Sequence, residues 1–344
     1  GTGIERLPIS DAADSDPSRM TFHAKLADLQ ASTGYRTLVG SAALRLTAAE
    51  TADSLAQKAK NDFGWFLAVH ALLPIAIEGG GSPLIGANPD LYGKWSADRV
   101  KRIDGNSDLE FTDAYLDDRA KMLTWLMQGN TTDRGYGPIQ GGENWQFLDV
   151  ASGQAAYALS TGSAIDRANA AAGDAKRLAA MFDEEMRRNL GHRVGFGGDG
   201  GDQITGGGLD DRVYGMSGND VLQGMGGNDH IEGGKDNDLL IGGAGNDVLN
   251  GGQGYDTYAR SADDGADVLI DADQQGRILI NGSGVKLLVK DGDVWKSPDG
   301  KLTLAQTDGR WKLAIAGGGS LDLGTDFNDG HYGIHRLETA PGGI

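Results

Sequence analysis

The stretch that decides the fold is residues 197–259, which read GGDGGDQIT GGGLDDRVY GMSGNDVLQ GMGGNDHIE GGKDNDLLI GGAGNDVLN GGQGYDTYA. These are seven nine-residue units without a gap, each with Gly first, Asp sixth and an apolar residue eighth. The sixth-position residues are Asp202, Asp211, Asp220, Asp229, Asp238, Asp247 and Asp256. The eighth-position residues are Ile204, Val213, Leu222, Ile231, Leu240, Leu249 and Tyr258.

The nine-residue spacing predicts a stack of short strands and tight turns. Glycine tolerates the positive φ that a tight turn requires, so the Gly-rich half of each unit is expected to turn. The other half predicts a three-residue strand whose eighth-position side chain points inward. Two units then make one coil, and the coils bury a ladder of apolar residues only by stacking on one another.

The repeat concentrates negative charge. It holds ten Asp and one Glu against Arg212 and Lys235, a formal charge of −9, which is half of the −18 carried by the whole chain. Stacked carboxylates repel unless a cation lies between them, and a hard divalent cation with oxygen ligands fits this need. Calcium fits better than magnesium because carboxylates and turn carbonyls form a large, flexible cage. No His or Cys recurs in the units, which disfavours zinc or copper.

These units resemble the haemolysin-type calcium-binding repeats of RTX proteins, which Gram-negative bacteria secrete. The resemblance implies a right-handed parallel β-roll in which each calcium lies between one turn and the turn two units later. It also implies the ligands: the carbonyls at positions two and four and the Asp of the first turn, with the carbonyls at positions one and three and the Asp of the second. About five or more ions are expected. The implied ligand sets are Gly198, Gly200 and Asp202 with Gly215, Ser217 and Asp220; Gly207, Leu209 and Asp211 with Gly224, Gly226 and Asp229; Met216, Gly218 and Asp220 with Gly233, Lys235 and Asp238; Met225, Gly227 and Asp229 with Gly242, Ala244 and Asp247; and Gly234, Asp236 and Asp238 with Gly251, Gln253 and Asp256.

Some units depart from the glycine pattern. Leu209 and Asp236 replace Gly at position four, and Met216 and Met225 replace it at position two. Their carbonyls are retained, but the backbone cost of the turn is expected to rise. Beyond the units, an acidic pattern continues out of register and is expected to close the roll. Its members are Asp264, Asp267 and Asp271.

Residues 1–195 predict a mostly helical domain. Thr47-Ala48-Ala49-Glu50 reads as a capping box that starts a helix, which Pro74 ends or kinks. Apolar spacing predicts further helices over residues 113–127 and 164–190, with Gly-rich loops at 79–93 and 129–143. The helical segments NDFGWFLAVHALLPIAIEG and FTDAYLDDRAKMLTWLM are similar to a region upstream of the repeats in some RTX lipases and effectors.

Residues 261–344 predict a β-rich cap. Short runs at 277–281, 285–290, 301–306 and 310–316 are separated by Asn-Gly and Asp-Gly turn signals, the pattern of antiparallel hairpins. This tail is similar to the C-terminal cap of RTX proteins and would hold any secretion signal. The predicted fold class is therefore α+β and multidomain: a helical domain (1–195), a β-roll of seven repeats (196–260) and an antiparallel cap (261–344).

Composition excludes several functions. The chain has no Cys, so it has no disulfide and no thiolate site. Its acidic balance argues against a nucleic-acid partner, and no apolar stretch is long enough to span a bilayer. No classical signal peptide is visible at the N-terminus. No Gly-x-Ser-x-Gly elbow is present, so we expect no enzyme activity in this chain.

The sequence leaves several functional readings open. The favoured one is a calcium-binding C-terminal module of a secreted bacterial protein, folding after type I-like export. The alternatives are an accessory domain of a lipase or hydrolase toxin whose catalytic part lies upstream, or an adhesive, partner-binding module. Asp104-Gly105-Asn106-Ser107-Asp108 resembles the start of an EF-hand loop but is better explained as a solvated loop or helix cap. His70 is expected to pack in the helical core.

Overall fold

The computed structural model describes residues 43–79, 81–104, 109–128, 144–158, 191–262, 264–271 and 273–339. The chain divides into two compact units. One holds the helices, and the other holds the repeats and everything after them. The predicted helix at 164–190 and the predicted loop at 129–143 lie outside the described residues.

The first unit contains a helical bundle and a small hairpin. Its described elements are β1 (Ala43–Leu46), the 3-10 turn η1 (Thr47–Ala49), α3 (Ala52–Asn61), α4 (Phe63–His70), β2 (Ile75–Glu78), α5 (Gly81–Ala87), α6 (Pro89–Ile103) and α7 (Asp113–Gln128). Strands β1 and β2 pair antiparallel. Trp65, Phe66, Trp95 and Leu116 are buried between the helices, so the two tryptophans anchor this core. The helix predicted over residues 113–127 is confirmed as α7.

Two expectations for this unit are wrong. The helix does not start at Thr47: Thr51 is the N-cap of α3, with its hydroxyl accepting from the Ser54 N–H at 3.2 Å. Thr47 instead donates its hydroxyl to the Leu73 carbonyl, and Glu50 accepts from Ser54 and Lys58, so neither residue makes the capping box. The segment expected as a loop over 79–93 contains α5 and the start of α6, because Pro at the first position of α6 is preset for a helix.

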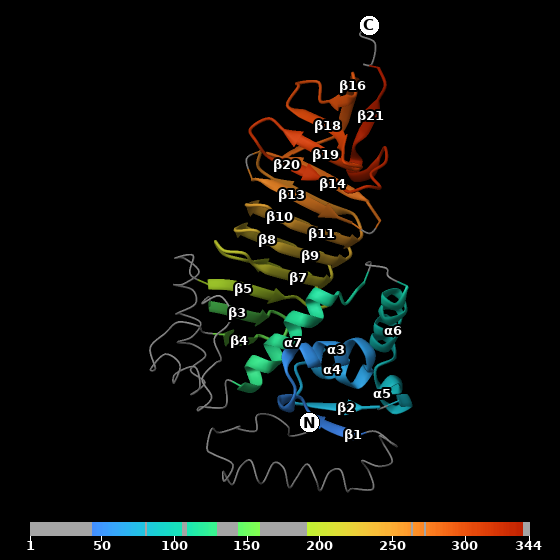
Figure 1. Cartoon of the computed structure of the whole chain (residues 1–344), viewed down its shortest axis with the longest axis vertical. Helices are drawn as coiled ribbons and strands as arrows, with labels where there is room; N and C mark the ends of the chain where they lie inside the picture. The colour runs from blue at the N-terminus through green and yellow to red at the C-terminus, as the bar shows by residue number, and fades with distance from the viewer. Residues whose placement is uncertain are drawn as a thin grey trace. The chain divides into compact units, whose positions relative to one another are not determined.

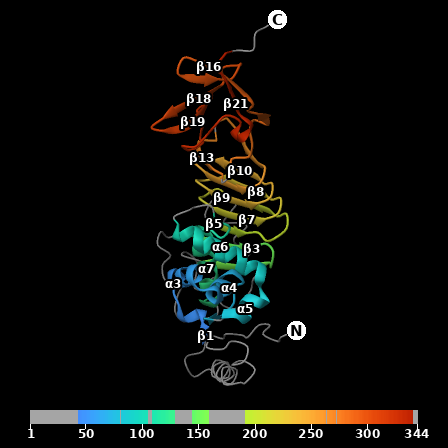
Figure 2. The ribbon, with the colours of Figure 1, turned by 90° about the vertical axis from the view of Figure 1, so that its right-hand side faces the viewer.

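The second unit is built on two parallel sheets whose strands alternate along the chain. One contains β5 (Gly191–Phe196), β7 (Arg212–Ser217), β9 (His230–Lys235), β11 (Val248–Gln253) and β13 (Ala266–Ile270) in that order. The other contains β6 (Gln203–Thr205), β8 (Val221–Gly226), β10 (Leu239–Ala244), β12 (Asp256–Arg260) and β14 (Gly276–Ile280). Figures 1 and 2 show these strands stacked in order from β7 to β13. Five strands in each sheet, counted over the described residues of 191–280, give a parallel β-solenoid of about five coils.

The strands are longer than the predicted three residues. In β7 to β11 each strand runs from position seven of one unit through position three of the next, because parallel pairing continues through the glycines. Val221 faces Leu239 and His230 faces Val248, so each coil advances by 18 residues.

The parallel ladder runs past both expected domain boundaries. β13 and β14 continue it beyond residue 260 with a step of 20 residues, pairing Val248 with Val268 and Tyr258 with Ile278. At the other end, β5 pairs with β7, and β3 (Asn144–Asp149) lies next to β5. β4 (Gln154–Ala158) follows β3 along the chain.

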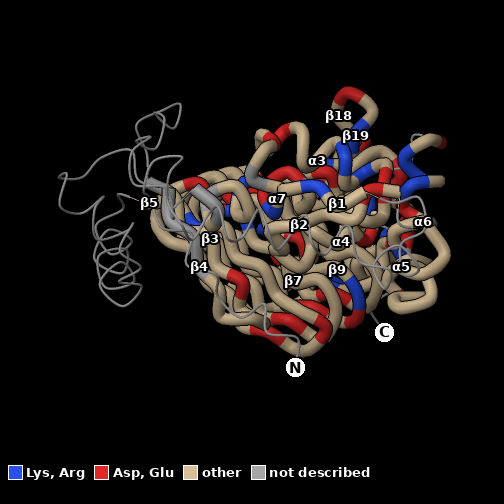
Figure 3. The backbone as a smooth tube through the Cα atoms, turned by 90° about the horizontal axis from the view of Figure 1, so that it is seen from below, with Lys and Arg blue, Asp and Glu red and all other residues tan. Residues whose placement is uncertain are grey.

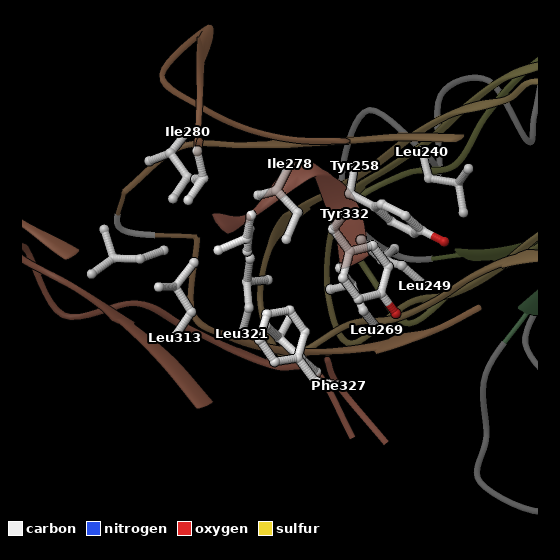
Figure 4. Close-up of a cluster of buried hydrophobic side chains, with 14 of the residues drawn as sticks. Leu240, Leu249, Tyr258, Leu269, Ile278, Ile280, Leu313, Leu321, Phe327 and Tyr332 are labelled. Atoms are coloured by element: carbon white, nitrogen blue, oxygen red, sulfur yellow. The ribbon is translucent and has the colours of Figure 1, made fainter. Parts of the chain in front are cut away.

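The eighth-position side chains form the core of the solenoid. From Ile204 to Leu249 each is at most 2% exposed, and Tyr258 extends the same cluster. Figure 4 shows Leu240, Leu249 and Tyr258 leading into residues such as Leu321 and Phe327 of the C-terminal segment. Burying one such side chain contributes about 1.5–3 kcal/mol, so the column is a large part of the driving force for stacking.

The C-terminal segment is mainly antiparallel. Its described elements are β15 (Ser283–Gly284), β16 (Leu287–Asp291), β17 (Val294–Lys296), β18 (Leu302–Thr307), β19 (Arg310–Ile315), β20 (Ser320–Asp322), the 3-10 turn η2 (His331–Gly333) and β21 (His335–Leu337). Asp308 and Gly309, both at positive φ, form the two-residue turn between β18 and β19. The run at 277–281 differs from expectation, because as β14 it pairs parallel with β12 and belongs to the solenoid.

Candidate metal centre

The repeat aspartates form two columns, one along each side of the solenoid. We call Asp202, Asp220, Asp238 and Asp256 the odd column, and Asp211, Asp229, Asp247 and Asp267 the even column. Within each column, one carboxylate oxygen, Oδ1, accepts a hydrogen bond from the backbone N–H of the preceding member. The bonds are 2.7 Å from Asp202 to Asp220, 2.8 Å from Asp220 to Asp238, 2.8 Å from Asp238 to Asp256, 2.7 Å from Asp211 to Asp229, 2.8 Å from Asp229 to Asp247 and 3.1 Å from Asp247 to Asp267.

The second carboxylate oxygen, Oδ2, is the unusual feature. Within the described residues it is buried and has no hydrogen-bond partner in five consecutive units: Asp220, Asp229, Asp238, Asp247 and Asp256. A buried carboxylate oxygen without a partner costs folding free energy, so such groups call for an explanation. In the first two units, by contrast, Oδ2 of Asp202 and Asp211 accepts from the N–H of Gly198 and Gly207.

The first-position glycines leave room beside these oxygens. A Cβ on Gly215 would overlap Asp220 Oδ2 and would lie 2.6 Å from the Gly233 carbonyl oxygen. At Gly224 the same arrangement recurs with Asp229 Oδ2 and the Gly242 carbonyl. The carboxylate of one unit and the position-one carbonyl two units later therefore converge on one space. Carboxylate and carbonyl oxygens are the donors that calcium takes, so the residues fit the ion that the sequence predicts.

The turns adopt the backbone that the repeat requires. Met216, Met225 and Asp236 have φ of 81°, 84° and 75°, and glycines at the equivalent positions of other units, such as Gly234 and Gly227, also have positive φ. The expected backbone cost at these three substitutions is thus present. Leu209 does not have a positive φ, so the cost expected there does not arise.

Some of the carbonyls predicted as ligands also belong to the strand ladder. Gly198 O accepts from Ser217 N at 3.1 Å, Gly207 O from Gly226 N at 3.0 Å, and Ala244 O from Gly227 N at 3.0 Å. A carbonyl oxygen has two lone pairs, so one hydrogen bond does not exclude a second partner. No group of three or more His, Cys, Asp or Glu side chains that could hold a metal occurs among the described residues. Each site would therefore depend on backbone oxygens as well as on its carboxylates.

Comparison with protein families identifies these units. Residues 196–231 and 223–258 match the model of the RTX calcium-binding nonapeptide repeat, which spans four copies. Residues 196–258 are RTX repeats. Comparison with curated proteins found no match to the chain.

RTX repeats are calcium-binding structural modules and are not catalytic. The match supports an RTX-type protein, as the sequence predicted, and it implies calcium as the ion. Among the described residues, none of the helices has the length and apolar character needed to cross a membrane.

Burial raises the pKa of the RTX carboxyls. The pKa is raised to about 8 for Asp229 and Asp238, about 7 for Asp247, and about 6 for Asp211, Asp220 and Asp256. Loss of water is the largest cause, and for most of them neighbouring column carboxylates add to it, while the backbone N–H bond opposes it. A cation between the layers would offset both the loss of water around each carboxylate and the repulsion between neighbouring carboxylates. Figure 3 shows acidic segments gathered at the bends beside β7 and β9.

The role of the fifth position was not predicted from the sequence. Asn219 Oδ1 accepts from the Asn237 N–H at 2.9 Å, and Asn237 Oδ1 accepts from the Tyr255 N–H at 2.7 Å. Asn228 and Asn246 make the same bond on the other side of the roll. The signal was present, since Asn occupies the fifth position in four consecutive units.

The remaining candidates lie away from the columns. His70 Nδ1 is 2.8 Å from the Tyr115 hydroxyl, and its ring packs on Phe66 and Phe111, as expected for a core residue. The EF-hand-like stretch falls mostly on residues 105–108, outside the described residues. At the end of the roll, Asp267 belongs to the even column, whereas Asp271 accepts from the Tyr258 hydroxyl at 2.7 Å.

Proposed function

We propose that this chain is the calcium-driven folding module of a secreted RTX protein. The observation that carries the proposal is the run of five consecutive buried Oδ2 atoms without a hydrogen-bond partner among the described residues. Without cations, each layer added to the solenoid would bury another negative charge next to the last. With calcium between the layers, the same oxygens become ligands and the stacking becomes favourable.

The proposed ligands are the five sets given by the repeat pattern, from Asp202 with Asp220 to Asp238 with Asp256. Under this proposal Asp220, Asp229 and Asp238 each serve two ions, because each belongs to two of these sets. The proposed organisation retains a helical part over residues 1–195, the roll and a C-terminal cap. The parallel pairing of the roll extends beyond the repeats to β14.

The proposal includes export by a type I-like system, with the signal in residues 261–344. Calcium is scarce in the cytosol and abundant outside the cell. The charged columns would therefore keep the repeats unfolded before export and would bind calcium afterwards. Metal binding would then supply the folding free energy where the protein is needed.

A calcium titration of the full chain tests the folding step. Circular dichroism of metal-stripped protein should show a gain of β-structure on adding calcium and its loss on adding chelator. Magnesium at the same concentration should give little change, because its small octahedral shell does not fit a cage of this size. An equal transition with magnesium, or full β-structure in metal-stripped protein, would contradict the proposal.

Export is tested separately. The full chain and a chain lacking residues 261–344 would be expressed with a type I secretion apparatus, and the culture medium assayed for each. We expect the full chain alone in the medium. Equal export of both chains would show that the signal does not lie in this segment.

A further inference from the structure

The last aspartate of the even column, Asp267, forms a buried ion pair with Arg260. Asp267 Oδ2 lies 2.8 Å from Nη1 of Arg260, and the two side chains are only 1% and 3% exposed. Among the described residues, the Oδ2 atoms of Asp229 and Asp247, which precede it in the column, have no hydrogen-bond partner. The guanidinium therefore contacts the oxygen atom that faces the proposed metal positions in the rest of the column.

Among the described residues, the hydrogen bonds of Arg260 to the backbone all go to carbonyl oxygens. Nη1 donates to Ser320 O at 2.7 Å, Nη2 to Gly265 O at 2.9 Å, and Nε to Ser261 O at 3.0 Å. One carboxylate and three carbonyl oxygens thus surround the guanidinium. This is the same kind of oxygen set that the repeats offer to calcium.

The next layer explains why a calcium site here would be weaker than those of the repeats. β20 pairs parallel with β13, and Leu321 faces Asp267 in the register where the column would require another Asp. Leu321 is 1% exposed and supplies no oxygen from its side chain. An ion at this level would lack its second carboxylate, whereas a guanidinium needs only one and brings five N–H donors of its own.

A glycine makes space for the guanidinium. A Cβ on Gly319 would lie 2.5 Å from Arg260 Nη2 and 2.5 Å from the Ala262 carbonyl oxygen. In the repeats, the first-position glycines leave the corresponding space beside the aspartate. The guanidinium of Arg260 and the proposed ions of the repeats therefore both lie beside a glycine, in space that a side chain on that glycine would fill.

We propose that Arg260 is a built-in cation that takes the place of calcium at the C-terminal end of the even column. It joins the last coil, at β13, to the C-terminal segment, at β20, without metal. The inference depends on the proposed calcium columns, because it treats Arg260 as the substitute for their ion. Its consequence is that this junction stays folded when the rest of the roll has lost its calcium.

Hydrogen–deuterium exchange on the full chain tests this proposal. In metal-stripped wild-type protein, the amides of β13 and β20 should keep their protection while those of β7 to β11 lose theirs. Arg260→Ala should lower protection at β13 and β20 at least tenfold without metal, and millimolar calcium should restore it, because the freed oxygens can then take an ion. Arg277→Ala is the matched control: Arg277 is exposed, lies on the neighbouring strand β14 and should leave β13 and β20 unchanged.

Two results would overturn the proposal. One is unchanged protection of β13 and β20 in metal-stripped Arg260→Ala. The other is a loss that calcium does not restore, which would make Arg260 a packing residue only. Failure of the proposed function would give a different result. The amides of β7 to β11 in the wild-type protein would then be equally protected with and without calcium.

Discussion

At the scale of the residue, the repeat uses each aspartate for two separate tasks. Oδ1 holds the neighbouring coil through its backbone N–H, and Oδ2 stays available for a cation. Only a carboxylate does both, because an amide has a single oxygen. The two tasks can therefore be separated by a substitution that keeps the shape and removes the charge.

Asp220→Asn is predicted to weaken calcium-dependent folding strongly. Asn keeps an oxygen for the Asp202 N–H but removes a ligand that the proposal assigns to two ions. We expect the calcium midpoint of the β-structure transition to rise tenfold or more, which corresponds to about 1.4 kcal/mol or more. Asp199→Asn, at an exposed third position, should leave the midpoint close to wild type. Equal midpoints for the two variants would contradict the ligand assignment.

Gly224→Ala is predicted to destabilise the roll by several kcal/mol. Its Cβ would overlap Asp229 Oδ2 and approach the Gly242 carbonyl, and both groups are fixed by the ladder. Gly200→Ala is the control, since a Cβ there meets nothing and its φ is not positive. Thermal unfolding in saturating calcium would compare them, and a similar melting temperature for both would show that the space beside Gly224 is not needed.

Met225→Gly is predicted to stabilise the calcium-loaded roll. Met225 has φ of 84° and a side chain that is 50% exposed, so its removal loses little packing. A left-handed residue other than Gly costs about 1–2 kcal/mol, part of which is offset by the larger backbone entropy of unfolded Gly. We expect a net gain of roughly 0.5–1 kcal/mol in chemical denaturation. A loss of stability would show that the Met side chain makes an important contact.

At the scale of the element, the columns predict an unusual dependence on pH. The folded carboxyls have pKa values of about 6 to 8, whereas unfolded Asp titrates near 3.9. Between these values the folded state binds more protons than the unfolded state. The stability of the metal-free roll is therefore greatest below about pH 4 and falls as pH rises through 6 to 8.

Metal-stripped protein should therefore contain more β-structure at pH 5 than at pH 8. In saturating calcium the order should reverse, because protons compete with the ion for the same oxygens. Circular dichroism at the two pH values, with and without calcium, would measure both. A metal-free roll that became more stable with rising pH would contradict the pKa directions.

The sequence predicts those features that follow from a local or repeated pattern of residues. It does not predict contacts between segments that only the fold brings together. The solenoid strands, their inward eighth position and the aspartate columns follow from the nine-residue period alone. Helix α7 follows from its apolar stripe. The capping box at Thr47 failed because Thr51, four residues on, makes the cap instead. The role of Arg260 could not be predicted, because its partners at Gly265 and Ser320 are brought together only by the pairing of β13 with β20.

At the scale of the whole molecule, one sheet of the roll continues into flanking strands at both of its ends. β5 and β3 continue one sheet on the N-terminal side, and β20 continues it on the other. Exposed sheet edges invite pairing with other chains, and flanking strands of this kind cover them. The C-terminal segment also shares one apolar cluster with the last coils, including Leu269, Leu321 and Tyr332.

The direction of the Oδ1 bonds makes the two ends of the solenoid unequal. From Asp202 to Asp247, the N–H of each column aspartate is accepted by the next member of its column, 18 or 20 positions later. Removing a coil from the C-terminal end leaves buried aspartate N–H groups without these acceptors, whereas removing one from the N-terminal end leaves N–H groups such as that of Val221, which donates to the Asp202 carbonyl, without theirs. A chain emerging N-terminus first therefore cannot complete the aspartate bonds of any coil until its successor has arrived.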